Sequence, residues 1–220
     1  MKFKALLTDL DGTLVHSQDP ICDALEESFR HVGAVPPGKD AILGMFGLPV
    51  EVMLTTLSDV AETETERIEE FIAEYKRQYP AKMVHARLID HAMDALAAAR
   101  QADFPICLIT SERRQNARFI LHALGLDRYI GYLISRDDVT RFKPDPEPLL
   151  KAAELVGCRP DACIYIGESP FDIQAGVAAG VYTVAVPSGN WPAESLTECN
   201  PDILIQDIQE LPALFQTDRP

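Results

Sequence analysis

The sequence lacks any pair of cysteines spaced as Cys-x-x-Cys, and its five cysteines are an odd number. They are Cys22, Cys107, Cys158, Cys163 and Cys199. Disulfide-stabilised scaffolds and structural zinc sites use paired or closely spaced cysteines, so neither class of protein is indicated. We expect reduced and mostly buried thiols, as is typical of a cytoplasmic protein.

The sequence also has no long hydrophobic run and little positive charge. No stretch approaches the ~20 apolar residues that a membrane-spanning helix needs, and Asp9 and Asp11 interrupt the apolar start of the chain where a signal peptide would continue. With 20 Lys and Arg against 34 Asp and Glu, the formal net charge is −14. Neither nucleic acid nor an anionic membrane is therefore an expected partner. Any site for an anion in this chain must be locally basic or hold a metal ion.

The chain does contain enough apolar material for a substantial core, because 47% of its 220 residues are hydrophobic. This length suits one domain, or one domain with a smaller insert. Residues 17–82 show helical spacing, most clearly over 63–79, and carry 13 Asp and Glu against 6 Lys and Arg. We predict an all-helical insert here, with the glutamates on a solvated helix face rather than in a functional acidic patch.

The rest of the chain alternates between short apolar runs and helical patterns. Strands are expected at 3–7, 105–110, 132–135, 163–166, 182–186 and 202–205, and helices at 90–102, 113–124, 146–156, 171–179 and 207–215. Strands that alternate with helices indicate a parallel sheet covered on both faces. The predicted fold class is therefore α/β.

The first expected strand ends in two carboxylates, Asp9 and Asp11, followed at once by Gly12. In an extended chain residues two apart point the same way, so both side chains would emerge at the carboxyl end of the strand. Ligands bind at that edge of an open parallel sheet. Hard cations such as magnesium take carboxylate oxygens, which indicates a metal site. The alternative, an Asp-Gly turn closing a hairpin, would leave Asp9 without a role.

Three further polar groups stand at expected strand ends or in loops: Thr110 with Ser111, Lys143, and Glu168 with Asp172. A parallel sheet would gather the groups at strand ends, three of the four counting Asp9 with Asp11, in one crevice. Carboxylates, a hydroxyl and a cation are the parts that phosphoryl transfer needs. Taken singly, Lys143 could be a surface lysine, while Thr110, Ser111 and Asp172 could belong to helix starts.

Four segments carry a resemblance to the haloacid dehalogenase-like superfamily. Its four motifs are similar, in order, to Asp9–Val15, Ile109–Ser111, Lys143–Pro148 and Gly167–Asp172. The match covers nearly all of the chain, and its sequence pattern is most similar to the phosphoglycolate-phosphatase and pyrophosphatase branch. It implies a Rossmann-like core formed by residues 1–16 and 83–220, and a helical cap formed by residues 17–82.

The resemblance also implies a role for each site residue. Asp9 would attack phosphorus and form a phosphoaspartate, with Asp11 as the general acid and base. Thr110 and Ser111 would hold the phosphoryl oxygens, and Lys143 would offset their negative charge. Mg²⁺, the implied cofactor, would be held by Asp9, the backbone carbonyl of Asp11 and Glu168. Asp172 would orient metal-bound water or Lys143 from outside the set of direct metal ligands.

The function implied is a magnesium-dependent phosphatase that hydrolyses a small soluble, phosphoglycolate-like monoester. Pyrophosphate and nucleotides are alternative substrates within the family. A phosphosugar mutase is less favoured, because Ile42–Leu54 contains no Lys or Arg for a second phosphate. A non-enzymatic phospho-accepting or binding protein is the least favoured alternative. A small phosphorylated metabolite is the expected partner, and the chain would act as a monomer or a homodimer.

Three positions depart from the family pattern. Glu168 stands where aspartate is usual, His16 stands where aspartate is common in this branch, and Glu112 stands where lysine is frequent. Glutamate remains an oxygen ligand, so the metal site would survive with a shifted ion. His16 is expected at the periphery, and Glu112 makes the mouth of the site less basic.

Overall fold

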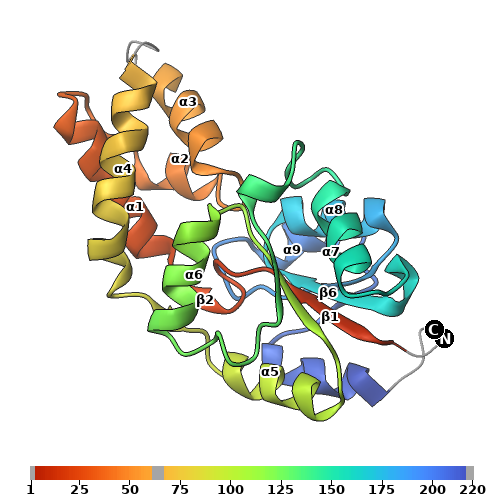
Figure 1. The fold of residues 1–220 in the computed structure, drawn as a ribbon. Helices are drawn as coiled ribbons and strands as arrows, with labels where there is room; N and C mark the ends of the chain where they lie inside the picture. The colour runs from red at the N-terminus through yellow and green to blue at the C-terminus, as the bar shows by residue number, and fades with distance from the viewer. Residues whose placement is uncertain (1–2, 61–66, 217–220) are drawn as a thin grey trace.

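The computed structural model describes residues 3–60 and 67–216. The described residues form a six-stranded parallel sheet in the order β5-β4-β1-β6-β7-β8, together with a separate two-stranded ribbon (Figure 1). The sheet strands are β1 (Ala5–Thr8), β4 (Ile106–Ile109), β5 (Tyr132–Ile134), β6 (Cys163–Gly167), β7 (Tyr182–Ala185) and β8 (Ile203–Leu204). The first strand in the sequence therefore lies in the middle of the sheet, between β4 and β6.

Helices cover both faces of the sheet, as the α/β prediction requires. Every residue of β1 is buried, and successive side chains of the strand enter different cores. Leu6 packs with residues of α5 (Ala92–Gln101), α6 (Arg114–Ala123) and the final 3₁₀ helix η4 (Ile208–Gln216). Leu7 packs on the other side with α7 (Glu147–Leu155) and α8 (Pro170–Ala179). A strand buried on both faces reads as a continuous apolar run, which is why the sequence revealed it.

The described residues between β2 (Val15–His16) and β3 (Arg87–Leu88) form four helices, which lie together beside the sheet (Figure 1). They are α1 (Gln18–His31), α2 (Lys39–Leu43), α3 (Val50–Val60) and α4 (Ile68–Met83). α1 and α4 pack through Phe29 and Phe71, whose ring centroids are 4.7 Å apart. The described part of 17–82 contains no strand, as predicted. Of the helix expected over 63–79, residues 63–66 lie outside the described residues; α4 also continues four residues further.

The helical segment joins the sheet through a short antiparallel ribbon that the sequence did not reveal. β2 (Val15–His16) pairs with β3 (Arg87–Leu88), so the outgoing and returning chains lie side by side. Two residues per strand are too few to show a periodic pattern. The division into a core of 1–16 and 83–220 and a cap of 17–82 stays a prediction, because it concerns how the parts move as units.

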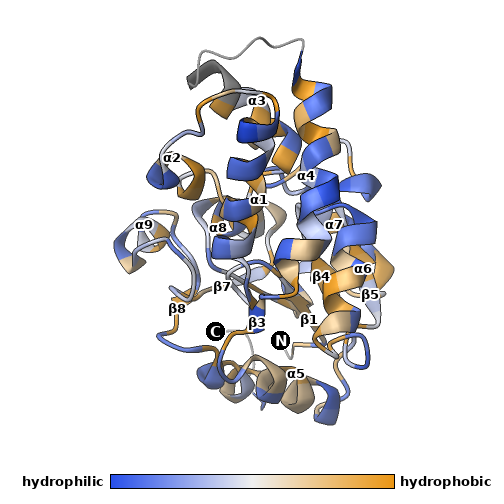
Figure 2. Cartoon of the chain, turned by 90° about the vertical axis from the view of Figure 1, so that its left-hand side faces the viewer, coloured by the Kyte–Doolittle hydropathy of each residue, from blue (hydrophilic) through white to orange (hydrophobic). Residues whose placement is uncertain are grey.

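Several short elements also differ from the expected ones. The expected helix at 207–215 is a 3₁₀ helix, η4, and Pro212 inside it has no N–H to donate to an α-helical bond. The segments η2 (Arg136–Asp138), η3 (Pro160–Ala162) and α9 (Ala193–Thr197) were not predicted. The helices show hydrophilic and hydrophobic colours side by side in Figure 2, as expected for elements with one buried face. No helix of the described chain is long and apolar enough to cross a membrane.

Candidate active site

Three of the predicted site residues lie just beyond the ends of neighbouring strands. Asp9 follows β1, Thr110 follows β4 and Glu168 follows β6. Because β4, β1 and β6 are adjacent and parallel, their carboxyl ends bring these residues to one edge of the sheet. This strand order is the physical reason why these residues lie near one another.

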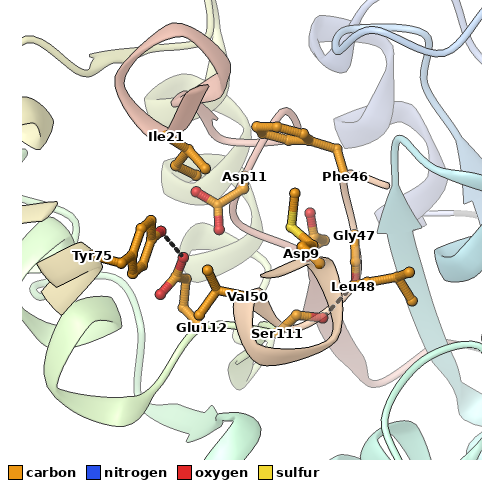
Figure 3. A pocket seen from close by; sticks show the side chains of 11 residues that line it. Asp9, Asp11, Ile21, Phe46, Gly47, Leu48, Val50, Tyr75, Ser111 and Glu112 are labelled. Carbon is orange, nitrogen blue, oxygen red and sulfur yellow. Dashed lines mark hydrogen bonds between the residues drawn. The ribbon is translucent and has the colours of Figure 1, made fainter. Parts of the chain in front are cut away.

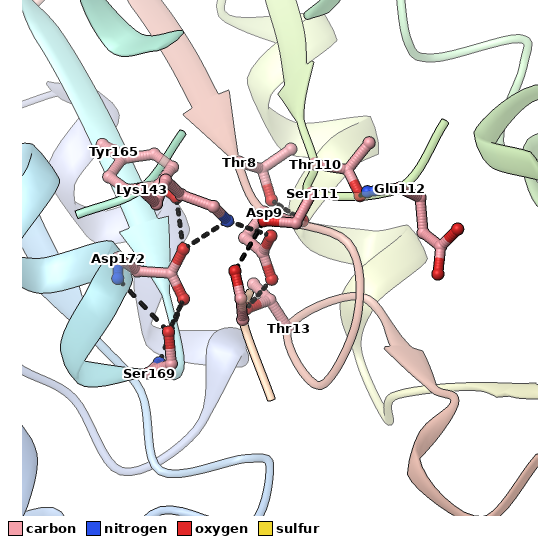
Figure 4. A network of polar contacts seen from close by, with 11 residues as sticks. Thr8, Asp9, Thr13, Thr110, Ser111, Glu112, Lys143, Tyr165, Ser169 and Asp172 are labelled. Atoms are coloured by element: carbon pink, nitrogen blue, oxygen red, sulfur yellow. Dashed lines mark hydrogen bonds and ion pairs between the residues drawn. The ribbon is translucent and has the colours of Figure 1, made fainter. Parts of the chain in front are cut away.

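Lys143 joins the nucleophile candidate to Asp172. Its Nζ lies 2.7 Å from Asp9 Oδ1 and 2.6 Å from Asp172 Oδ1, and only 1% of the lysine is exposed (Figure 4). Burial alone would lower the pKa of Lys143, but the charges of Asp172 and Asp9 outweigh it and raise the pKa. Lys143 is therefore a buried, permanently charged ammonium group rather than a surface lysine.

Asp172 is fixed by the residues around it. Ser169 and Asp172 form a capping box at the start of α8, and the Tyr165 hydroxyl donates to Asp172 Oδ1 at 2.6 Å. Burial disfavours the charged form of Asp172, yet Lys143 and these hydrogen bonds outweigh burial and hold its pKa below the usual value. Asp172 thus begins a helix, as one interpretation of the sequence had it, and is also paired with Lys143.

Asp9 and Asp11 carry more negative charge than Lys143 balances. Burial raises the pKa of Asp9 to about 7, with a further increase from Asp172 and an opposing effect from Lys143. Burial raises the pKa of Asp11 to about 7 as well, and the charge of Glu112 is the next cause. A carboxyl group with a pKa near neutrality can both give and accept a proton, which suits Asp11 to acid–base chemistry.

Thr110 and Ser111 hold different positions at the end of β4. Thr110 Oγ1 accepts a hydrogen bond from the Glu112 amide at 3.1 Å, which leaves its own hydrogen available for a phosphoryl oxygen. Ser111 Oγ donates to the Gly47 carbonyl at 2.5 Å. Ser111 therefore links the sheet to the helical segment, a contact that the sequence did not reveal.

A small cavity lies between the strand ends and the helical segment (Figure 3). Asp9, Asp11, Ser111 and Glu112 line it from the sheet side. The helical segment contributes a set of mostly apolar side chains, Ile21, Phe46, Leu48, Val50, Met53 and Tyr75. Its volume is about 30 Å³ in this structure. A phosphate ester is larger than this space.

The sequence places this geometry in a known family. Residues 6–186 match the family described as haloacid dehalogenase-like hydrolases. The chain belongs to this family. The resemblance read from the four motifs is thereby confirmed.

Two relatives agree with membership of the haloacid dehalogenase-like hydrolases, and one solved structure has the same fold. A phosphoglycolate phosphatase of Thiobacillus denitrificans is 30% identical, over 96% of this chain and 94% of its own. The pyrophosphatase PpaX of Halalkalibacterium halodurans is 26% identical, over 96% of each chain. The crystal structure of a predicted phosphoglycolate phosphatase from Haemophilus somnus 129pt superposes with a TM-score of 0.89 at 22% identity, covering 98% of this chain and 99% of that one. That likeness confirms the α/β fold.

The acid that departs from the family pattern, Glu168, is deeply buried in this hydrolase's site. It is 1% exposed, and its Oε2 has no hydrogen-bond partner among the described residues. Burial raises its pKa well above the usual value, and the charges of Asp172 and Asp9 raise it further. A divalent cation would supply the missing opposite charge, and carboxylate and carbonyl oxygens are its preferred ligands.

The expected metal set of the hydrolase has only two side chains, Asp9 and Glu168, together with the Asp11 carbonyl. In 3–60 and 67–216, no three His, Cys, Asp or Glu side chains cluster as a metal site would require. A set of two carboxylates and one backbone carbonyl is smaller than such a cluster. The residues present fit a hard cation, although the structure does not place one.

Two residues outside the predicted set shape the site of this hydrolase. Tyr165 holds Asp172, and Gly189 lies directly against Glu168: a Cβ built on Gly189 would be 2.0 Å from Glu168 Oε2. The capping-box spacing of Ser169 and Asp172 was readable in the sequence. The role of Gly189 was not, because it depends on where a distant loop folds. His16 lies in the exposed β2 ribbon and does not line the cavity, as expected.

We predict that Gly189→Ala raises the metal requirement of the hydrolase. The added methyl group would displace the Glu168 carboxylate, so half-maximal activity should need about 10-fold more Mg²⁺. Gly131→Ala is the matched control, since its Cβ would meet nothing closer than 3.9 Å. Activity is measured against Mg²⁺ concentration for both variants. An unchanged requirement in Gly189→Ala would show that Glu168 does not need its present position.

Proposed function

We propose that this hydrolase is a magnesium-dependent phosphatase that hydrolyses a small phosphate monoester through a phosphoaspartate. One observation carries the proposal: the buried Asp9 carboxylate lies 2.7 Å from the Lys143 ammonium and lines a cavity at the strand ends. A carboxylate held there is a nucleophile beside a fixed positive charge. The phosphatases among its relatives support the same reaction class.

In the first step an Asp9 oxygen forms a bond to phosphorus as the bond to the ester oxygen breaks. The departing alkoxide takes a proton from Asp11, so the alcohol leaves neutral. Lys143 stays charged throughout and balances the negative charge that Asp9 shares with the phosphoryl group. The Thr110 hydroxyl is available to donate to a phosphoryl oxygen.

In the second step water attacks the phosphorus of the phosphoaspartate. Asp11, now ionised, takes the proton of that water, and the bond between phosphorus and the Asp9 oxygen breaks. Inorganic phosphate leaves, Asp9 returns as a carboxylate, and Asp11 is again protonated. Asp11 thus acts as acid and then as base, a double role to which its pKa of about 7 is suited.

Asp9, the Asp11 carbonyl and Glu168 would hold Mg²⁺ in this scheme. When bound, the ion would supply positive charge that neutralises the phosphoryl oxygens. Asp172, already paired with Lys143 at 2.6 Å, orients the lysine. Ser111, tied to the Gly47 carbonyl, offers its backbone amide rather than its hydroxyl to the phosphoryl group.

Residues 17–82 would act as a cap over this site. The polar contacts between the two parts include Ser111 with Gly47, Arg113 with Glu51, and Tyr75 with Glu112. Apolar side chains of both parts also share one buried cluster. Opening would admit the ester, and closure would exclude water from the reacting group.

The experiment that tests this function measures phosphate release from p-nitrophenyl phosphate. The protein is stripped of metal with EDTA and then titrated with MgCl₂. Turnover that requires Mg²⁺ is expected. Turnover that is equal with and without the ion would contradict the metal dependence, and no turnover at any concentration would contradict the reaction class.

Glu168→Ala should then raise the Mg²⁺ concentration for half-maximal activity by about 10-fold or more. The variant loses a buried carboxylate oxygen that has no partner in the described protein. Glu154→Ala removes an exposed glutamate and is the control. The rise in Tm on adding Mg²⁺ gives a second readout, and it should shrink only in Glu168→Ala. Equal Mg²⁺ responses in the two variants would remove Glu168 from the metal site.

A further inference from the structure

No lysine or arginine of the described chain lines the cavity into which the alcohol part of the ester would extend. Its lining residues in the described chain are three carboxylates, one serine, one glycine and the apolar set of the helical segment (Figure 3). The loop and helix that close it, Ile42–Leu54, contain no Lys or Arg. A substrate with a second anionic group would find no partner for that group here.

The nearest basic side chains are already paired. Lys143 lies between Asp9 and Asp172. Arg113, next to Glu112 in sequence, bonds to Glu51 and to Asp137, and Arg114 bonds to Asp138. Recruiting any of them for a substrate anion would break an ion pair that the described structure holds.

Glu112 is one of the carboxylates that line this space. It is 9% exposed, and the Tyr75 hydroxyl donates to its Oε1 at 3.3 Å while Asn116 Nδ2 donates to its Oε2 at 2.8 Å. A carboxylate has about four acceptor positions, so each oxygen keeps one for a ligand. The two contacts come from α4 and α6 and hold the carboxylate in place beside Asp11.

We propose that Glu112 selects a phosphate monoester whose alcohol carries an amine and no second anion. The ammonium group would donate to Glu112, and the carbon skeleton would lie against Phe46, Leu48 and Met53. A bound ammonium would favour the charged form of Glu112, whereas an anionic group would meet this carboxylate at close range, and such a like-charge contact suppresses wrong partners strongly. This inference rests on the proposed phosphatase function. It departs from the phosphoglycolate-like or pyrophosphate substrate that the family resemblance implied.

The test compares esters of similar size whose alcohol parts carry a positive charge, no charge or a negative charge. One series is phosphoethanolamine, ethyl phosphate and phosphoglycolate; the other is glucosamine 6-phosphate, glucose 6-phosphate and 6-phosphogluconate. We expect kcat/KM for the amine to exceed that for the carboxylate by about 100-fold in at least one series. Pyrophosphate should be hydrolysed no better than the carboxylates.

Glu112→Gln keeps the size and an acceptor but removes the charge. The ratio of kcat/KM between amine and carboxylate should fall by about 10-fold in this variant. The ratio is internal to each protein, so a general loss of activity does not affect it. The wild-type ratio stands on its own even if the variant does not fold.

The outcomes separate the two proposals. Turnover of p-nitrophenyl phosphate with equal or better use of the carboxylates in both series would overturn the role of Glu112 and leave the phosphatase intact. A preference for amines that Glu112→Gln does not change would also overturn it. Failure to hydrolyse any ester in the presence of Mg²⁺ would overturn both proposals.

Discussion

Replacing Asp9 by Asn is expected to lower kcat for phosphate-ester hydrolysis by about 10⁴-fold or more. The amide of asparagine is a poor nucleophile and forms no stable acyl phosphate, so the first step of the proposed route is lost. Wild-type protein quenched in acid during turnover of a ³²P-labelled ester should carry label on the chain, and Asp9→Asn should carry none. Asp94→Asn, which makes the same change at an exposed position, is the control.

The fold should tolerate this substitution. Burial and the charge of Asp172 raise the pKa of Asp9 to about 7, so its carboxylate is less stable in the metal-free protein than a free carboxylate would be. Lys143 keeps its ion pair with Asp172 when Asp9 becomes neutral. Circular dichroism and urea unfolding should therefore show a protein as stable as the wild type. Full turnover by a folded Asp9→Asn would show that another group is the nucleophile.

Much of the site could be predicted from the sequence because it stands at strand ends. Asp9, Thr110 and Glu168 each follow a short buried run, and adjacent parallel strands bring such residues together. Lys143 follows no strand in this way. Its placement rested on its resemblance to a family motif, and the structure supplies the physical reason, a pair of carboxylates within 2.7 Å.

The features that could not be predicted depend on contacts between distant loops. Position 189 needs a glycine because the loop after β7 passes directly over Glu168. The β2–β3 ribbon has two residues in each strand, too few for any period to show. Glu112 was visible as a departure from the family, but its burial and its bond to Tyr75 arise from the packing of α4 near β4.

The acidity of the chain also limits how the site can bind a phosphate group. The formal net charge is −14, and the cavity itself adds carboxylates rather than cations. In the proposed mechanism, phosphate binding depends on one buried lysine and on a metal ion rather than on a basic surface. We therefore expect Lys143 to matter for both folding and catalysis.

Lys143→Met is accordingly expected to reduce the free energy of unfolding by about 3–5 kcal/mol and to abolish turnover. Removing the ammonium leaves Asp9 and Asp172 buried at 5% and 1% exposure with no positive partner. Urea unfolding in EDTA, where no metal ion can substitute for the lysine, measures the loss. Lys76→Met changes an exposed lysine in α4 and should cost less than about 0.5 kcal/mol.

A second substitution separates the two roles of Lys143. Lys143→Met with Asp172→Asn removes one of the two stranded charges, so part of the stability should return while turnover stays absent. Mg²⁺ should also restore part of the stability of Lys143→Met, because an ion held by Asp9 and Glu168 supplies the missing positive charge. A loss below about 1 kcal/mol in Lys143→Met would contradict the ion-pair argument, since an unpaired buried carboxylate cannot be that inexpensive. Turnover in the double variant would show that charge balance at Asp9, rather than the lysine itself, is what catalysis requires.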